Sequence, residues 1–140
     1  LLDIVKFIEK QIRDNKPEII FTHFENDLNI DHQIIYKAVI TASRPLSKTF
    51  VNKIYSFEIP SSTDFFVSRK SKKIFNPNFF INVDSTIDKK INLLKIYTDE
   101  IKKWPHSRSL KSIKNLAMYR GSQIGIKYAE AFIIVRELQN

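Results

Sequence analysis

The sequence predicts an α/β layered fold with a mainly parallel sheet, and three observations predict it. Segments with helical apolar spacing alternate with short apolar runs along all 140 residues. The short runs are rich in β-branched and aromatic residues, as strands are. Such alternation is typical of helices that cover a parallel sheet. No internal repeat or linker interrupts the pattern, so we expect a single domain over residues 1–140.

The first half of the chain predicts two helices and two strands. Apolar side chains recur at helical spacing over 2–14, and Pro17 ends that helix. EIIF at 18–21 is a short apolar run typical of a buried parallel strand. A second helix is expected over 31–45, and the alternating segment VNKIYSFEIP at 51–60 predicts another strand. The apolar positions of the two helices are Leu2, Val5, Ile8, Ile12, Ile34, Ile35, Ala38, Val39 and Ala42.

The second half predicts a strand, two helices and a last segment of undecided type. FFINV at 79–83 has the composition of a strand, and an apolar stripe predicts a long helix over 87–101, with polar residues before it that can cap it. Another helix is expected from Leu110, and Gly121 is placed to close it as the first residue beyond its end. The final apolar run, 129–138, fits either a strand or a helix.

The composition is that of an ordinary soluble protein, with 43% hydrophobic and 27% charged residues. No apolar run approaches the roughly 18 residues of a membrane span, and no signal peptide opens the chain. Cysteine is absent, which excludes disulfides, thiolate metal sites and cysteine nucleophiles. We therefore expect a cytoplasmic protein without a membrane span.

The net charge of +8 makes nucleic acid or another anion a candidate partner. The clearest basic cluster comprises Arg69, Lys70, Lys72 and Lys73, and no aromatic residues interleave with it as a stacking platform requires. We expect no nucleic-acid partner, and anion binding by the charged surface stays a third interpretation. Both glycines lie in RGSQIG at 120–125, which excludes glycine-rich phosphate-binding loops.

The segment FTHFENDLNIDH at 21–32 carries two of the three histidines, interleaved with acidic residues. It lies where a strand leads into a helix, and parallel sheets bind their ligands beyond the carboxyl ends of the strands. His32 is expected in the first helical turn, where a neutral imidazole can bind zinc and a neighbouring carboxylate can orient it. The alternative is an Asp31 cap followed by an exposed histidine. The spacing lacks the glycine and glutamate of a calcium loop.

The segment THFENDLNIDHQIIYKAVITASRP resembles the central motif of the LmbE-like, or PIG-L, family of zinc-dependent N-deacetylases. The likeness continues in order at YSFEIPSST, FNPNFFINVDSTIDKKI, PHSRS and RGSQIGIKYAEAF, so it covers nearly the whole chain. The resemblance implies a Rossmann-like three-layer sandwich with a mainly parallel sheet. It makes residues 1–140 the C-terminal part of the deacetylase domain.

The resemblance also implies roles for individual residues. His32 corresponds to a zinc ligand. Asp31 corresponds to a carboxylate that either orients the zinc ligand without touching the metal or relays charge. Asn29 stands where many members have a histidine that stabilises the oxyanion; an amide can donate a hydrogen bond there but cannot transfer a proton. His106 either takes that role or binds substrate. Arg108 is a candidate for binding an anionic or hydroxyl-rich substrate group.

His23 is a candidate for substrate binding or for orienting the loop.

The other two zinc ligands and the general base of the family come from an H-P-D-D segment that is absent from this sequence. One histidine does not make a catalytic zinc site, so we expect this chain to hydrolyse nothing by itself and to be the later part of a longer protein.

The predicted function is therefore a metal-dependent hydrolase that removes an acetyl or other acyl group from the amine of an N-acetylglucosamine-type or related substrate. It would be active only with the missing segment, and zinc would be its cofactor. The alternative is a catalytically incomplete family member that binds a glycan or a protein. A homo-oligomer is compatible with either interpretation.

Overall fold

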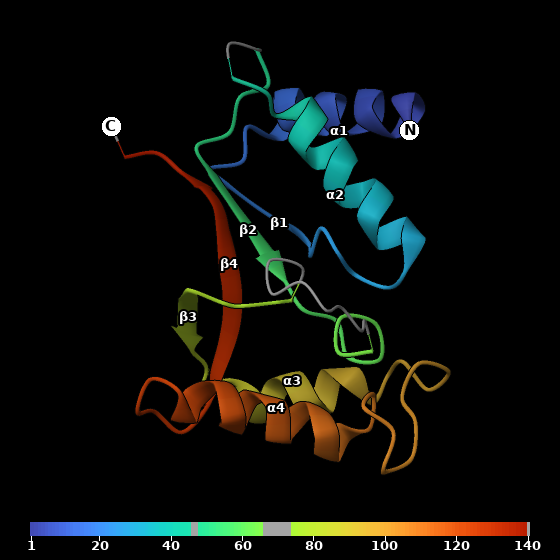
Figure 1. The fold of residues 1–140 in the computed structure, drawn as a ribbon, viewed down its shortest axis with the longest axis vertical. Helices are drawn as coiled ribbons and strands as arrows, with labels where there is room; N and C mark the ends of the chain where they lie inside the picture. The colour runs from blue at the N-terminus through green and yellow to red at the C-terminus, as the bar shows by residue number, and fades with distance from the viewer. Residues whose placement is uncertain (46–47, 66–73, 140) are drawn as a thin grey trace. The chain divides into compact units, whose positions relative to one another are not determined.

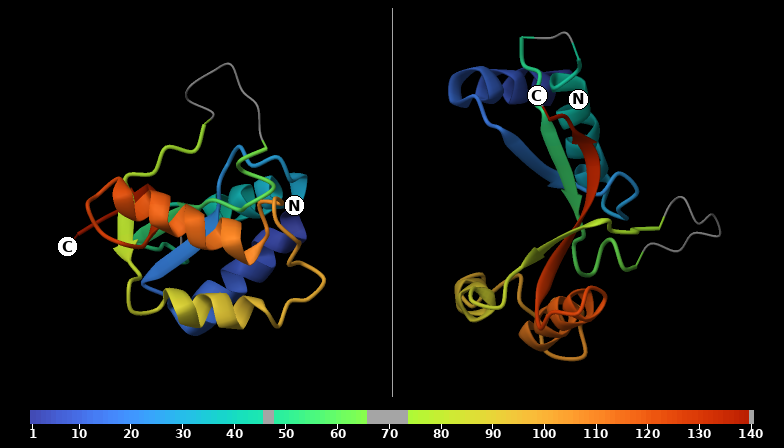
Figure 2. Two further views of the ribbon diagram at one scale, coloured as in Figure 1. Left: turned by 90° about the horizontal axis from the view of Figure 1, so that it is seen from below. Right: turned by 90° about the vertical axis from the view of Figure 1, so that its left-hand side faces the viewer.

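The computed structural model describes residues 1–45, 48–65 and 74–139. The chain forms two compact units: the first is Leu1–Pro77 with Phe132–Asn140, and the second is Asn78–Ala131. Figures 1 and 2 show the elements of each unit. The basic cluster at 69–73 lies outside the described residues. Among the described helices, none combines the length and the apolar character needed to cross a membrane.

The first unit contains the elements α1, β1, α2 and β2 and most of β4. Their bounds are Leu2–Asn15 for α1, Ile19–His23 for β1, Ile30–Ala42 for α2, Lys53–Phe57 for β2 and Ala129–Glu137 for β4. The two helices pack together, and Ile20 of β1 packs against the apolar cluster that they form with the segment before β2. The buried members of this cluster are Val5, Ile12, Ala38, Ala42 and Val51.

Both helices end where local backbone chemistry stops them. Lys16 has a left-handed backbone, with φ of 47°, and its N–H donates to the Ile12 carbonyl at 2.8 Å, which closes α1 just before the proline. The second helix ends at Ala42, three residues short of the predicted end. There the Ser43 hydroxyl donates to the Val39 carbonyl at 2.7 Å, a side-chain bond that competes with further helix.

The α/β class is confirmed, but the mainly parallel sheet is wrong. The four strands are hydrogen-bonded in the order β1-β2-β4-β3, where β3 is Phe79–Asn82, and only the β1–β2 pair is parallel. β2 and β4 pair antiparallel. The prediction assumes that single helices connect the strands, as in a parallel sheet, but two helices, α3 and α4, separate β3 from β4.

The second unit contains β3, the helices α3 and α4, and the start of β4. α3 spans Ile87–Leu94, so the predicted long helix ends seven residues early, and α4 spans Leu110–Ser122. The two helices lie side by side (Figures 1 and 2). The buried side chains of this unit's core are Val83, Ile87, Ala117 and Tyr128. The final apolar run forms the strand β4.

The capping role predicted for Gly121 is wrong, and that predicted for the residues before α3 holds in position only. Gly121 does not close α4 from outside, because it lies within the helix. Its missing Cβ lets the chain pass close by: an added Cβ would lie 2.6 Å from the Ile126 carbonyl oxygen. The N-cap of α3 is Thr86, one of the polar residues expected to cap it, although no side-chain hydrogen bond caps the helix. The Asp84 carboxylate accepts the backbone N–H of Tyr128 at 2.6 Å and so joins the segment before α3 to the segment before β4.

Candidate functional site

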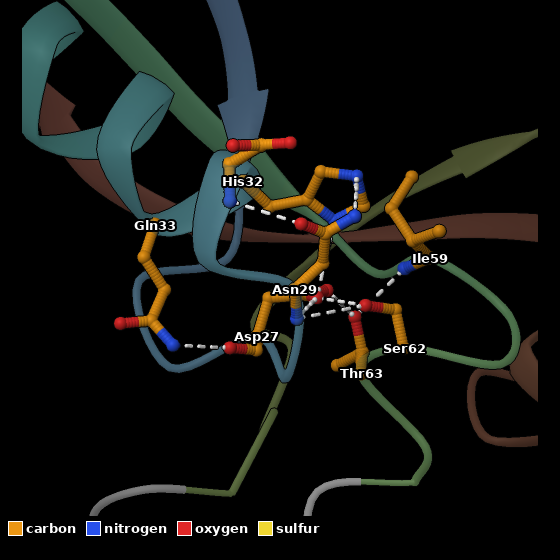
Figure 3. Close-up of polar contacts among 8 residues, drawn as sticks. Asp27, Asn29, His32, Gln33, Ile59, Ser62 and Thr63 are labelled. Atoms are coloured by element: carbon orange, nitrogen blue, oxygen red, sulfur yellow. Dashed lines mark hydrogen bonds and ion pairs between the residues drawn. The ribbon is translucent and has the colours of Figure 1, made fainter.

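The polar residues of FTHFENDLNIDH gather in the first unit, beyond the carboxyl ends of the parallel strands β1 and β2. The loop after β1 leads into α2, and the loop after β2 brings residues 59–63 alongside it (Figure 3). Parallel pairing aligns His23 with Phe57, so both strands end at the same level. The two loops that follow them are therefore neighbours, which is why hydrogen bonds can form between them.

Asp27 is the centre of this network, and its side chain is completely buried. Its Oδ1 accepts the backbone N–H of Asn29 at 2.9 Å, lies 3.1 Å from His32 Nδ1, and also accepts the hydroxyl of Ser62. Its Oδ2 accepts the Thr63 hydroxyl at 2.6 Å. Burial alone would raise the pKa of the Asp27 carboxyl. These four hydrogen bonds outweigh burial, so the pKa lies below its ordinary value of 3.8 and the group is charged at neutral pH.

The charge on Asp27 determines how the His32 ring is protonated. A carboxylate can only accept hydrogen bonds, so Nδ1 of His32 must carry the proton that lies between the two groups. Nε2 of the neutral ring then keeps its lone pair. The His32 side chain is 20% exposed, so that lone pair lies on a partly solvent-accessible ring. A neutral imidazole with a free Nε2 and a carboxylate behind Nδ1 is the usual form of a metal-binding histidine.

Asn29 is the N-cap of α2, and this role orients its amide. Its Oδ1 accepts the backbone N–H of Asp31 at 2.9 Å, and only the oxygen of an amide can accept. The Nδ2 group is consequently the end that lies 3.4 Å from His32 Nε2. With its lone pair on Nε2, His32 accepts this hydrogen bond, and a metal held by Nε2 would take the place of the Asn29 amide.

His23, the last residue of β1, stacks on His32. The ring centroids are 4.2 Å apart and the planes differ by 13°. Burial lowers the pKa of His23, a charge on His32 lowers it further, and Asp27 partly offsets both. Its Nδ1 is buried, and no described residue hydrogen-bonds to it. The contacts of His23 are those of a neutral ring that supports the loop.

Asp31 lies in the first turn of α2 and is exposed. Its backbone N–H is the group that Asn29 caps, and a carboxylate there is favourable near the positive end of the helix dipole. The carboxylate bonded to His32 is that of Asp27, not that of Asp31.

His106 and Arg108 belong to the second unit, in the turn before α4. His106 Nδ1 accepts the backbone N–H of Arg108 at 3.0 Å, which leaves the proton of the neutral ring on Nε2. The guanidinium of Arg108 forms an ion pair with Glu100. The structure therefore brings four of the predicted site residues together in the first unit, namely His23, Asn29, Asp31 and His32.

The first-unit cluster fits one ligand of a metal site. His32 has the protonation and the supporting carboxylate that a zinc ligand needs. Within residues 1–45, 48–65 and 74–139, however, no three histidine, cysteine, aspartate or glutamate side chains converge as metal ligands would. A catalytic zinc site needs three protein ligands, and the described residues hold no such set.

The part played by Asp27, Ser62 and Thr63 is not predicted from the sequence. Asp27 is 35 and 36 positions from the two hydroxyl residues, so no local pattern joins them. A usable signal did exist. Three consecutive hydroxyl residues, at 61–63, follow the strand at 51–60, and in a parallel pair such a loop lies beside the loop after the neighbouring strand.

Comparison with known proteins finds similarity in structure alone, because no family model and no curated protein matches the chain. A conserved protein from Thermus thermophilus matches with a TM-score of 0.74 and 16% identity over 100% of this chain and 61% of its own. The 4-carboxy-2-hydroxymuconate hydratase of Pseudomonas putida matches with a TM-score of 0.72 and 19% identity over 100% and 62%.

A third solved structure is the N,N'-diacetylchitobiose deacetylase of Pyrococcus horikoshii. It matches with a TM-score of 0.68 and 15% identity, over 96% of this chain and 51% of the deacetylase. The chain thus spans about three fifths of the first two neighbours and about half of the third. At such low sequence identities, the structural similarity shows a shared fold and nothing about activity. The chain therefore shares its α/β fold with a deacetylase and a hydratase over part of their lengths.

Proposed function

We propose that this chain is part of a metal-dependent hydrolase that removes an acetyl or other acyl group from the amine of a sugar-like substrate. One observation carries the proposal: the Asn29 amide presents N–H donors 3.4 Å from Nε2 of His32. Hydrolysis of an amide needs both a means of activating the carbonyl and donors for the oxyanion that forms. The fold likeness to a deacetylase agrees with this reaction class.

The residues of the chain have distinct tasks in this proposal. His32 Nε2 would hold zinc, which when bound polarises a carbonyl and lowers the pKa of water. Asn29 donates hydrogen bonds from Nδ2 to the substrate oxygen that becomes negative. Its Oδ1 is engaged by the helix cap, so the donor end of the amide is already oriented before substrate arrives. The further ligands and the general base would come from polypeptide outside the described residues.

A binding module is the second candidate, and one observation favours it. The described residues contain no set of three metal-ligating side chains. In that case the polar loop cluster would bind a glycan through its amide, hydroxyl and imidazole groups, without turnover.

The test measures zinc binding and acetate release from N-acetylglucosamine oligosaccharides by the protein in its native polypeptide context. We expect His32→Ala to weaken zinc binding at least tenfold and to abolish acetate release. Lys10→Ala, on the exposed surface of α1, is the control and should leave both unchanged. Zinc binding that His32→Ala does not weaken would refute the assignment, and glycan binding without zinc or turnover would favour the binding module.

A further inference from the structure

We propose that Asp27 is a positioning residue that holds the His32 ring with its proton on Nδ1 and its lone pair on Nε2, and that Ser62 and Thr63 lock Asp27 in place. The inference rests on the proposed function for its purpose, because a histidine that holds a metal through Nε2 needs its lone pair on that nitrogen. It assigns to Asp27 the supporting role that the resemblance implies for Asp31.

The Asp27 carboxylate is held in one orientation because it is buried and because both of its oxygens accept hydrogen bonds. The side chain has no exposed surface. Oδ1 accepts a hydrogen bond from the backbone N–H of Asn29, and Oδ2 accepts one from the hydroxyl of Thr63. Rotation about the carboxylate would break bonds to two separate loops at once. A buried acceptor with all these donors has one orientation, so the ring that donates to it has one orientation as well.

The hydroxyl groups of the loop after β2 can point in only one direction. Thr63 Oγ1 accepts the backbone N–H of Ile59 at 2.8 Å, so its own proton is directed to Asp27 Oδ2. Ser62 Oγ accepts the N–H of Asn29 at 3.2 Å and donates to Asp27 Oδ1. Each hydroxyl is therefore both donor and acceptor, and the two loops are joined by a continuous chain of hydrogen bonds (Figure 3).

The same carboxylate also positions the oxyanion donor. Asp27 Oδ1 accepts both the Asn29 backbone N–H and the His32 Nδ1–H, so one atom sets the relative placement of both residues. Asp31 has no comparable position. Its side chain is exposed in the first turn of α2, where water competes for its oxygens.

The experiment reads the tautomer of His32 directly by long-range ¹H–¹⁵N NMR of the metal-free protein, at about pH 8, above the ordinary pKa of histidine. His32→Gln assigns the ring signals by their disappearance. Asp27→Asn removes the negative charge at nearly constant shape. Asp31→Asn makes the same chemical change on an exposed carboxylate four residues away and is the matched control.

We expect the Nδ1–H tautomer to be the major form of His32 in the wild-type protein and in Asp31→Asn, and to lose population in Asp27→Asn, whose neutral amide oxygen is a weaker acceptor than the carboxylate. A wild-type ring protonated mainly on Nε2 would overturn the proposal, whether or not Asp27→Asn folds. So would a change of tautomer in Asp31→Asn. Because no metal is present, this outcome is separate from the proposed function, which fails if the expected tautomer is found but zinc does not bind to His32.

Discussion

The imidazole rings of His23 and His32 lie face to face, with 4.2 Å between their centroids and 13° between their planes. One ring ends β1 and the other lies in the first turn of α2, so the stack joins the two ends of the loop that contains Asp27. Burial lowers the pKa of His23, and a charge on His32 at this distance lowers it further. The stack therefore favours a neutral His23 ring.

Replacing His32 should raise the pKa of His23. Burial lowers that pKa and a charge on His32 lowers it further, so His32→Gln removes one cause and exposes the His23 ring to water. The pKa should move toward its ordinary value of 6.5. NMR titration of the His23 ring proton measures it, with Lys10→Ala as the control. An unchanged or lower pKa in His32→Gln would show that the rings do not interact.

Removing the buried carboxylate should destabilise the first unit strongly. Asp27→Ala leaves the donors of Ser62, Thr63 and Asn29 without their acceptor, and unpaired buried donors cost about 1–3 kcal/mol each. We expect a loss of about 3 kcal/mol or more in the free energy of unfolding by urea denaturation. Asp31→Ala should cost no more than about 1 kcal/mol, the value of a carboxylate at a helix start. Equal losses would contradict the central role of Asp27.

The contribution of Asp27 to stability should disappear in acid. Its pKa is lower in the folded chain than the ordinary 3.8, so the unfolded chain takes up the proton first as pH falls. The stabilisation is therefore complete above about pH 3.8 and is lost as pH falls through the folded pKa. The difference in unfolding free energy between wild type and Asp27→Asn should shrink over this range. A difference that stays constant would show that the pKa is not lowered by folding.

Asn29 combines a structural and a chemical task, and two substitutions separate them. Serine caps helices about as well as asparagine but has no amide N–H, so Asn29→Ser should change the unfolding free energy by less than about 0.5 kcal/mol. Loss of one oxyanion donor typically lowers kcat about 10²–10³-fold. Asn29→Ala should lose the cap as well, at a cost of about 1 kcal/mol. Wild-type turnover in Asn29→Ser would exclude the amide as the donor.

Gly121 should not tolerate a methyl group. A Cβ there would lie 2.6 Å from the Ile126 carbonyl oxygen and 2.9 Å from the Lys127 carbonyl carbon, and both neighbours are backbone. Overpacking of this kind costs about 1–3 kcal/mol, more than the gain of up to about 1 kcal/mol in helix propensity. Thermal unfolding should therefore show a lower Tm for Gly121→Ala. The exposed Asn115→Ala in the same helix should be neutral or stabilising. A similar gain in both variants would disprove the clash.

Local chemistry explains which parts of the fold could be predicted. The helix α1 follows its apolar spacing and ends beside a proline. The sequence offers Asp31 as a cap of α2, whereas Asn29 caps it in the structure. The direction of β4 could not be read from any segment, because it depends on pairing with β2, a strand more than 70 positions away in the sequence. The early end of α3 is a similar case. The apolar stripe continues to Ile101, but the helix ends at Leu94.

The sequence by itself determined where the helices begin and where the first three strands lie, and that Asn29 and His32 stand three positions apart as an amide and an imidazole at the start of α2. Only the tertiary structure decided which carboxylate serves His32. Asp31 is adjacent in sequence but points to solvent, whereas Asp27 is buried and bonded to hydroxyls 35 and 36 positions away. Those bonds exist because β1 and β2 pair in parallel and bring their following loops together, a relationship between distant segments that no local pattern contains.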